Sequence, residues 1–214
     1  MAAPLSPNRW VRLMKDLYLI VGLGNPGREY AETRHNIGFL LLEHLASSWG
    51  APWKMEKKFQ SLLARLEQDE RKILLCRPQS FMNSSGQAVA ALTQFYQLPL
   101  ERVLVAVDDA DLPLGQLRLR PCGSSGGHHG LESIERQLGT RDYPRLRLGI
   151  GRRAEDGRQI TDYVLGRFLA EERKTVSEIL ERAGEQAQCW LNAGIQEAMN
   201  RFNGAVTAQN KGKE

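Results

Sequence analysis

The sequence predicts a single α/β domain with a mixed, twisted β-sheet flanked by helices and with further helices at its C-terminal end. Two wholly apolar runs, residues 17–21 and 103–107, are typical of strands that are buried on both faces of a sheet. Segments with helical periodicity lie between the strands, and this alternation indicates a layered α/β protein. Two short strands at residues 59–66 and 72–76 flank a turn-like segment, so a hairpin should make the sheet mixed.

The first half of the chain should add two helices to these strands. Thr33 resembles a helix N-cap, and apolar residues at helical spacing carry that helix to about Trp49. Ser84 or Ser85 should cap a second helix that runs through Gln97. Its apolar face is expected to consist of Ala88, Ala91, Leu92 and Phe95.

In the second half, the apolar strand at residues 103–107 stops on two acidic residues, Asp108 and Asp109. A further strand is expected where Leu and Arg alternate, because alternate side chains of a strand point to opposite faces. The remaining predicted elements are this strand at 116–120, a glycine- and serine-rich loop at 122–130, a short helix at 131–138, a strand at 146–150, and one or two helices over 171–203.

Composition excludes several classes of protein. The chain has 214 residues, which is enough for one well-buried domain. No apolar run approaches the roughly 20 residues that a membrane span needs. The three cysteines, Cys76, Cys122 and Cys189, are scattered without a CxxC pair. This pattern favours a reducing compartment over a disulfide framework or a zinc module.

Three short motifs suggest other chemistry, but each lacks the flanking elements or partner residues that this chemistry requires. Residues 22–27 match G-x-G-x-x-G after a strand, but the next N-cap is Thr33, too far along for the helix dipole to meet a pyrophosphate. Residues 123–127 match G-x-S-x-G, but the last histidine, His129, follows with no Asp between, which excludes the usual order of a serine hydrolase triad. The adjacent His128 and His129 lack a second ligand pair, so neither a metal nor a cofactor is expected.

Four polar residues at element ends could perform chemistry. His35 stands at a helix start, Asp108 ends a buried strand, and Asn25 and Asn83 lie in turns. An imidazole backed by a carboxylate is a general base, and water is the natural nucleophile because no activated Ser or Cys is evident. Carboxamides can orient that water or donate to an oxyanion. Taken singly, each residue could also be a helix cap or a surface residue.

Cations are concentrated in one segment. The net charge is +4, and residues 115–153 hold eight Arg against three acidic residues. Arg has the fork that fits phosphate best. The loop at residues 122–130 leads into a helix whose free N–H groups attract anions. A phosphate or the 3′ end of a nucleic acid is therefore a reasonable ligand for this loop. A solvated basic face and a flexible turn explain these stretches about equally well when each is taken alone.

Four ordered blocks make the chain resemble the bacterial-type peptidyl-tRNA hydrolases over residues 17–203. The blocks are VGLGNPGREYAETRHNIG (21–38), RPQSFMNSSG (77–86), VDDADLPLGQLRLR (107–120) and GSSGGHHGLESI (123–134), supported by RLRLGIGR (145–152) and YVLGRF (163–168). The resemblance implies an enzyme that hydrolyses the ester between a peptide and the 3′ ribose of tRNA, and thereby recycles tRNA from prematurely released chains. It also implies a monomer that acts on the acceptor stem and 3′ end of peptidyl-tRNA, without a metal, a cofactor or a membrane.

The same resemblance assigns roles to single residues. His35 would be the catalytic base and Asp108 its partner. The substrate would be bound by Asn25, Tyr30, Met82, Asn83 and Gly126. Phosphates of the tRNA would be bound by Arg118, Arg120 and Arg147.

One position departs from the family pattern. After the glycine loop the family is expected to read Gly-Gly-His-Asn-Gly, whereas this chain has His129 at the asparagine position. An imidazole offers one hydrogen bond at each nitrogen and a charge that varies near about pH 6.5, unlike a carboxamide. We therefore expect His129 to bind substrate in a working but altered site.

Two other functions stay open on sequence alone. His129 motivates a non-hydrolytic RNA-binding protein on the same scaffold, and the glycine motif leaves a nucleotide-dependent oxidoreductase. The domain should span residues 17–204, with a polar tail at 205–214. The extension at residues 1–16 is basic and lacks a secretory apolar region, which favours mitochondrial targeting, with a cytoplasmic protein and a disordered extension as the alternative.

Overall fold

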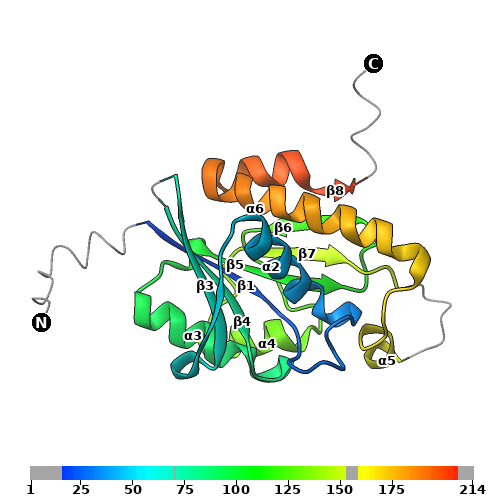
Figure 1. Ribbon diagram of the computed structural model, residues 1–214, viewed down its shortest axis with the longest axis horizontal. Coiled ribbons are helices and arrows are strands. Elements are labelled where there is room, and N and C mark those ends of the chain that lie inside the picture. Colours follow the sequence, from blue (N-terminus) through cyan, green and yellow to red (C-terminus); the bar gives the residue numbers. More distant parts are fainter. Residues whose placement is uncertain (1–15, 70, 153–158, 207–214) are drawn as a thin grey trace, which may run out of the picture.

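The computed structural model describes residues 16–69, 71–152 and 159–206. These residues form one eight-stranded sheet in the order β2-β3-β4-β1-β5-β7-β6-β8 (Figure 1). The strands are β1 (Leu17–Gly22), β2 (Trp53–Glu56), β3 (Ser61–Gln68), β4 (Arg71–Pro78), β5 (Val103–Asp109), β6 (Gln116–Arg120), β7 (Arg145–Gly149) and β8 (Gly204–Ala205).

The sheet is mixed, as the sequence predicts. The four central strands, β4, β1, β5 and β7, run parallel to one another. β3 and β2 at one side, and β6 and β8 at the other, run antiparallel to their neighbours. β1 lies between β4 and β5. The chain that leaves β1 continues to strands on the β4 side, whereas the chain that leaves β5 continues to β6 and β7 on the other side. The carboxyl ends of these strands therefore border a crevice, where α/β sheets usually bind their ligands.

Helices cover both faces of the sheet (Figure 1). One hydrophobic cluster packs α2 (Ile37–Ser48) and α6 (Arg173–Phe202) on one face, and a second packs α3 (Ser85–Tyr96) and α4 (His129–Leu138) on the other. A shorter helix, α5 (Ile160–Val164), follows β7. No helix in the described part of the chain is both long and apolar enough to cross a membrane.

The C-terminal helix folds back on itself, which resolves the expected one or two helices into two segments (Figure 1). Gly194 has φ 84° and ψ 175°, which lie outside the helical region. A residue with a side chain would be strained in this backbone conformation. Gln186 on the first segment donates a hydrogen bond of 3.0 Å to Ala198 O on the second. The second segment then leads into β8, which pairs with β6.

The structure corrects the predicted starts of two helices. Thr33 precedes a 3-10 turn, η1 (Arg34–Asn36), and its hydroxyl donates to Tyr30 O rather than capping the helix, so α2 begins only at Ile37. Helix α4 begins at His129 rather than at residue 131, because the His128 side chain provides a cap that the sequence does not announce.

The predicted apolar face of α3 is wrong at one position. Val89 is fully buried, whereas Phe95 is 49% exposed and packs edge-on against Phe59 and Tyr96 at the surface. Three strands or helices were not predicted at all: β2, α5 and the two-residue β8. β2 is an edge strand of mixed polarity, and α5 is only five residues long, so neither shows a period that sequence alone could reveal. Residues 1–15, on which the targeting expectation rests, and the tail from residue 207 lie outside the described residues.

Candidate active site

The predicted base and its carboxylate meet at the carboxyl ends of the parallel strands. Asp108 lies near the end of β5, and His35 lies on η1, which follows the turn after β1. His35 Nδ1 is 2.8 Å from Asp108 Oδ1. The Asp108 side chain is 4% exposed and that of His35 12% exposed. A buried carboxylate thus orients an imidazole that still reaches the surface, which is the arrangement of a general base.

A second imidazole holds the same carboxylate. His128 Nε2 lies 3.0 Å from Asp108 Oδ1, on the same oxygen that His35 contacts. His128 Nδ1 accepts the backbone N–H groups of Gly130 at 3.1 Å and Leu131 at 3.3 Å, and so caps α4. An acceptor nitrogen carries no proton, so the proton of neutral His128 is on Nε2 and is donated to Asp108.

These contacts determine which nitrogen of His35 is free to accept a proton. Asp108 accepts a hydrogen bond from His128, and as a carboxylate it also accepts the Nδ1–H of His35. The Nε2 of His35 then keeps its lone pair. Burial by itself would raise the pKa of Asp108, but the charge interactions and hydrogen bonds with His35 and His128 outweigh burial and hold that pKa well below its usual value. The carboxylate therefore stays ionised and can stabilise an imidazolium at His35.

The carboxamide of Asn25 has a defined orientation. Its Oδ1 accepts the backbone N–H of Met82 at 2.8 Å. Its backbone is held by Asn36, whose Oδ1 accepts the Asn25 N–H at 2.8 Å and whose Nδ2 donates to the Asn25 carbonyl at 2.9 Å. With its oxygen already engaged, Asn25 presents Nδ2 as a hydrogen-bond donor at the cleft.

Met82 and Asn83 come from η3 (Met82–Ser84), which follows β4. Met82 is buried beneath the cleft, and Asn83 is exposed at its rim. Gly130 lets α4 approach this turn, because a Cβ at Gly130 would lie 2.6 Å from the sulfur of Met82. The turn after β4 and the start of α4 are therefore packed together, and they carry cleft residues from both sides.

Asp109 and Arg147 brace the glycine loop rather than face open solvent. Asp109 Oδ1 accepts the backbone N–H groups of Asp111 and, at 3.2 Å, of Leu112, and its Oδ2 accepts Arg147 Nη1 at 3.0 Å. Arg147 Nη2 donates to the carbonyls of Ser124 at 2.7 Å and Ser125 at 3.1 Å. The guanidinium therefore links the end of β5 to the loop that leads into α4.

A cleft of about 350 Å³ joins these groups. One wall is polar and holds the base, its carboxylate and the carboxamides. Apolar residues of α5 and the residue after it also line the cleft. The cleft lining includes Asn25, His35, Phe81, Met82, Asn83, Asp108, Gly126, His128, His129, Arg147, Ile160, Val164 and Leu165.

Two of the three predicted phosphate-binding arginines lie on an open surface. On β6, Leu117 and Leu119 are buried under α6, so Arg118 and Arg120 project from the other face of the sheet and are exposed. Arg118 is paired in register with Arg147. The Arg147 side chain is only 14% exposed and is engaged with the loop, so its predicted contact with tRNA would have to be made from within the cleft.

The remaining predicted substrate residues differ in their placement. Gly126 and His129 line the cleft, and the His129 side chain is 69% exposed with Nδ1 3.1 Å from Glu132 Oε2. Tyr30 is half-buried in the turn before η1 and is not among the lining residues, so the structure does not bring it into the cleft. The adjacent histidines diverge, since His128 is buried against Asp108 and His129 faces solvent.

Sequence reasoning missed several residues of this site. His128 has no predicted role beyond the rejected metal motif, although it holds Asp108. Asn36, which supports Asn25, directly follows the base in the chain and could be suspected from that position. Phe81 is 61% exposed at the cleft, and an exposed aromatic beside a predicted site residue is a usable signal. The apolar lining from α5 has no sequence signal.

The donor set of the site also bears on metal binding. Within the described residues, His35, Asp108 and His128 form the one group whose ligand atoms lie close enough to hold an ion, all within 4.8 Å of one another. Hydrogen bonds account for the nitrogens that face Asp108 Oδ1, and the second nitrogen of His128 accepts backbone N–H groups. This arrangement fits a chain of proton donors, and the absence of a metal stays a prediction.

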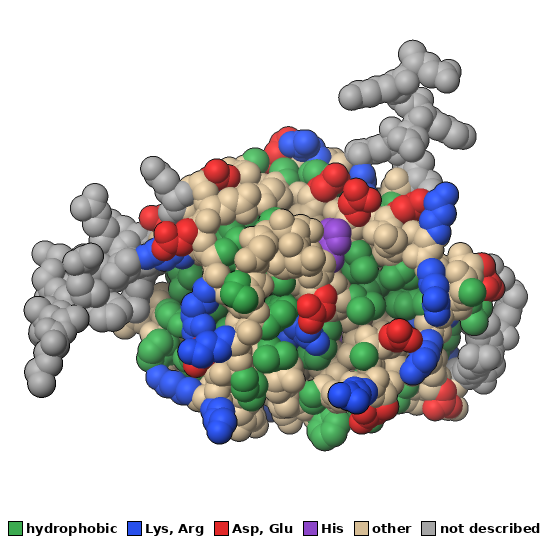
Figure 2. All heavy atoms as spheres, in the orientation of Figure 1, with side chains coloured by type: hydrophobic (Ala, Val, Ile, Leu, Met, Phe, Trp, Pro, Cys, Tyr) green, Lys and Arg blue, Asp and Glu red, His purple; other side chains and the backbone are tan. Residues whose placement is uncertain are grey.

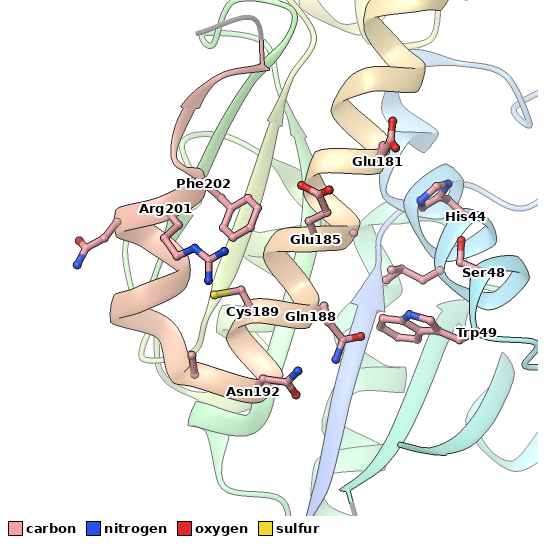
Figure 3. Close-up of a pocket in the computed structure, with 14 residues that line it drawn as sticks. His44, Ser48, Trp49, Glu181, Glu185, Gln188, Cys189, Asn192, Arg201 and Phe202 are labelled. Atoms are coloured by element: carbon pink, nitrogen blue, oxygen red, sulfur yellow. The ribbon is translucent and has the colours of Figure 1, made fainter. Parts of the chain in front are cut away.

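A larger hollow lies on the opposite layer, over α2 and α6 (Figure 3). It has a volume of about 890 Å³. His44 and Ser48 on α2, and Trp49 directly after it, face the hollow from one side, and Glu181 and Glu185 on α6 border it. Figure 2 shows both carboxylate and Lys or Arg side chains on this side of the molecule. No residue of the base-and-carboxylate site lies here.

A buried carboxylate that orients an imidazole at the switch point of an α/β sheet, beside an oriented carboxamide donor, is the arrangement expected of an enzyme that activates a nucleophile by general-base catalysis. Comparison with known proteins specifies which family of such enzymes this is. The sequence profile of the family described as peptidyl-tRNA hydrolase matches residues 19–212. The chain belongs to the peptidyl-tRNA hydrolase family, as the sequence blocks predict.

Individual relatives agree with this assignment. A peptidyl-tRNA hydrolase from a Synechococcus strain is 46% identical over 187 residues, 87% of this chain and 83% of that protein. One from Caldanaerobacter subterraneus is 46% identical over 188 residues, 88% of this chain and all of that protein. The crystal structure of peptidyl-tRNA hydrolase from Acinetobacter baumannii superimposes with a TM-score of 0.83 at 36% identity and covers 89% of this chain and 96% of that chain. Each of the three is named a hydrolase, and nothing in them supports a non-hydrolytic RNA-binding protein or an oxidoreductase.

Proposed function

We propose that this protein hydrolyses the ester between a peptide, or an N-blocked aminoacyl group, and the 3′ ribose of tRNA, with water activated by His35. Membership of the peptidyl-tRNA hydrolase family supports the substrate and the reaction. The single observation that carries the mechanism is the 2.8 Å contact between His35 Nδ1 and the buried Asp108. It leaves His35 Nε2 as the proton acceptor at the cleft.

The reaction follows from these positions. His35 Nε2 takes a proton from water, and the oxygen of that water attacks the ester carbonyl carbon. Asp108 stabilises the imidazolium that forms. The carbonyl oxygen becomes an oxyanion, to which the Nδ2 groups of Asn25 and Asn83 are the available donors. When the intermediate collapses, the 3′ oxygen of the ribose leaves and takes the proton from His35, which yields a free peptide acid and tRNA.

The tRNA would approach from the side of β6 and the glycine loop. Arg118 and Arg120 are exposed there, and Gly126 and Arg147 line the adjacent part of the cleft. On α6 four Arg or Lys side chains are balanced by four carboxylates, so this helix offers a polyanion no net positive charge. In this arrangement the acceptor stem contacts the arginines and the 3′ end enters the cleft, with the protein acting as a monomer and Tyr30 near the entrance.

His129 differs from the expected asparagine in the hydrogen bonds that it can offer. Its exposed imidazole lines the cleft and contacts Glu132 through Nδ1, which leaves Nε2 for substrate. A His129→Asn variant, whose carboxamide offers an oxygen and an NH₂ group instead, should therefore hydrolyse the same ester at a different rate. An identical rate would remove His129 from the substrate-binding residues.

The decisive experiment is incubation with N-acetylated aminoacyl-tRNA. Wild type should release the acetylated amino acid, and His35→Ala should lower kcat by roughly 10³-fold or more while still binding tRNA. His44→Ala is the matched control, since His44 is a half-buried histidine on the opposite layer. Binding without release by the wild type would overturn the proposal.

A further inference from the structure

A buried cation lies directly beside the base. Arg34 is 5% exposed, and its guanidinium forms a fork with Glu172, at 3.2 Å from Nη1 to Oε1 and 2.7 Å from Nη2 to Oε2. Its central carbon lies 4.7 Å from the ring centre of Tyr163 and 4.8 Å from that of Phe168. Nη1 also reaches Ile150 O at 3.5 Å. All of these contacts of the Arg34 side chain are therefore with residues that follow β7.

The backbone repeats this link. Arg34 N donates to Gly166 O at 2.9 Å, and Thr33 forms an isolated antiparallel bridge with Arg167. Tyr163 donates its hydroxyl to Ile150 O at 2.8 Å, which ties α5 back to the end of β7. One buried residue and its neighbour therefore join η1, which carries the base, to α5 and the turn after it.

The segment held in this way forms part of the cleft. Ile160, Val164 and Leu165, which we term the apolar wall, line it, and Ile160 and Leu165 remain 48% and 43% exposed. Phe81, 61% exposed, lines the cleft as well. Exposed apolar groups in a cleft indicate a site for an apolar ligand group. In an acyl ester whose carbonyl lies beside His35, the group closest to that carbonyl that could be apolar is the side chain of the esterified amino acid.

We propose that Arg34 is a positioning residue that fixes the apolar wall relative to His35, so that an apolar side chain bound against the wall presents its ester to the base. The inference rests on the proposed function, because it assumes that the acyl ester binds in this cleft. Arg34 touches no substrate and acts through the placement of α5. A lysine could keep the charge but not the two-point fork or the flat stacking between two rings.

The test compares two esters that differ in the side chain next to the scissile bond, N-acetylleucyl-tRNA and N-acetylglycyl-tRNA. For wild type, kcat/KM should favour the leucyl ester by about tenfold, as expected for an apolar side chain in a partly open site. Arg34→Lys should reduce this ratio toward one, mainly by slowing the leucyl ester, and Glu172→Gln should act in the same direction. Arg167→Gln is the matched control, because Arg167 pairs with Glu32 beside the same turn but is 65% exposed.

A double-mutant cycle separates positioning from loss of fold. Leu165→Ala removes part of the apolar wall and should lower the leucyl preference by itself. In the Arg34→Lys background, Leu165→Ala should change the ratio little further, because both substitutions act through the same wall. Thermal unfolding of each variant identifies the assay temperature at which all are folded.

Three results would overturn the inference while leaving the hydrolase intact. These are equal losses of activity on both esters in Arg34→Lys, an unchanged leucyl preference, and additive effects of Arg34→Lys and Leu165→Ala. Failure of wild type to hydrolyse either ester would instead overturn the proposed function, so the two failures are distinguishable.

Discussion

The two hollows of the molecule differ in a way that volume does not capture. The hollow over α2 and α6 has about 890 Å³, and the cleft at the carboxyl ends of the strands about 350 Å³. The larger one is bordered by Glu181 and Glu185, which are exposed on a helix surface. The smaller one contains Asp108, which is 4% exposed and contacted by two imidazoles.

This difference shows what makes a hollow into a site. Exposed carboxylates interact mostly with water, so their charges are screened and their orientations are free. A buried carboxylate needs partners, and its partners then have fixed orientations and tautomers. The partners of Asp108 are His35, which follows β1, and His128, which caps α4, and these segments distant in sequence converge at the end of β5. Substitutions at the buried carboxylate should therefore have far greater effects than substitutions on the exposed surfaces.

Asp108→Asn should reduce activity by an amount comparable to the loss of the base itself. Its amide can present a donor where His35 needs an acceptor, so the tautomer of His35 with a free Nε2 is lost and kcat should fall by roughly 10³- to 10⁴-fold. Single-turnover release from N-acetylated aminoacyl-tRNA measures this fall. A loss of less than about tenfold would separate Asp108 from catalysis.

The same variant tests the lowered pKa of Asp108. Because the folded state lowers this pKa, the ionised carboxylate stabilises the protein at neutral pH, and that contribution is lost as the pH falls below the ordinary range of an aspartate. The difference in unfolding free energy between wild type and Asp108→Asn should therefore shrink as the pH is lowered from 7 to about 3. Urea titrations at several pH values measure it. A difference that grows toward acid pH would contradict the assignment.

His128 combines two roles that a pair of substitutions can separate. Asn is a good helix N-cap but lacks the reach of an imidazole to Asp108, whereas Ala provides neither function. His128→Asn should lower kcat by about 10- to 100-fold with near-normal stability. His128→Ala should lower kcat similarly and also destabilise the protein by about 1 kcal/mol. Equal stability of the two variants would show that the cap contributes little.

Arg118 and Arg120 should affect binding rather than chemistry. Each substitution to Ala should reduce the slope of log affinity for tRNA against log salt by about 1, with kcat nearly unchanged. Lys174→Ala is the control, since Lys174 is 87% exposed but lies on α6, away from β6 and the cleft lining. Filter binding between low and moderate salt measures these slopes. Equal slopes for Arg118→Ala and Lys174→Ala would exclude the β6 surface from tRNA binding.

Glu185→Gln in the larger hollow should change least. The side chain is exposed on α6, so its substitution should change stability by less than about 0.5 kcal/mol and leave kcat and KM unaltered. Thermal unfolding and the ester assay on the same preparation test both quantities. A clear change in KM would show that the larger hollow takes part in substrate binding and would remove the functional difference between the two hollows.

Prediction from sequence succeeded where a pattern is local or repeated. The apolar runs of β1 and β5, the β3–β4 hairpin and the alternation of β6 are all present in the structure. It failed for β2, α5 and the start of α4, because a short or mixed element has no period and a histidine cap is uncommon. For the site, His35, Asp108, Asn25 and Asn83 come together as the ends of parallel strands predict, whereas Tyr30 stays outside the cleft.

Residue identity along the chain was enough to define the α/β class, the strands that end at the crevice, and the family through its ordered blocks. Packing in three dimensions set the geometry that no local pattern contains. Packing placed His128 against Asp108 and turned the oxygen of Asn25 toward the backbone N–H of Met82. It also engaged Arg147 with the glycine loop and paired Arg34 with Glu172. A buried polar group must find its partner across the fold, and only the packing of distant segments determines which residue that partner is.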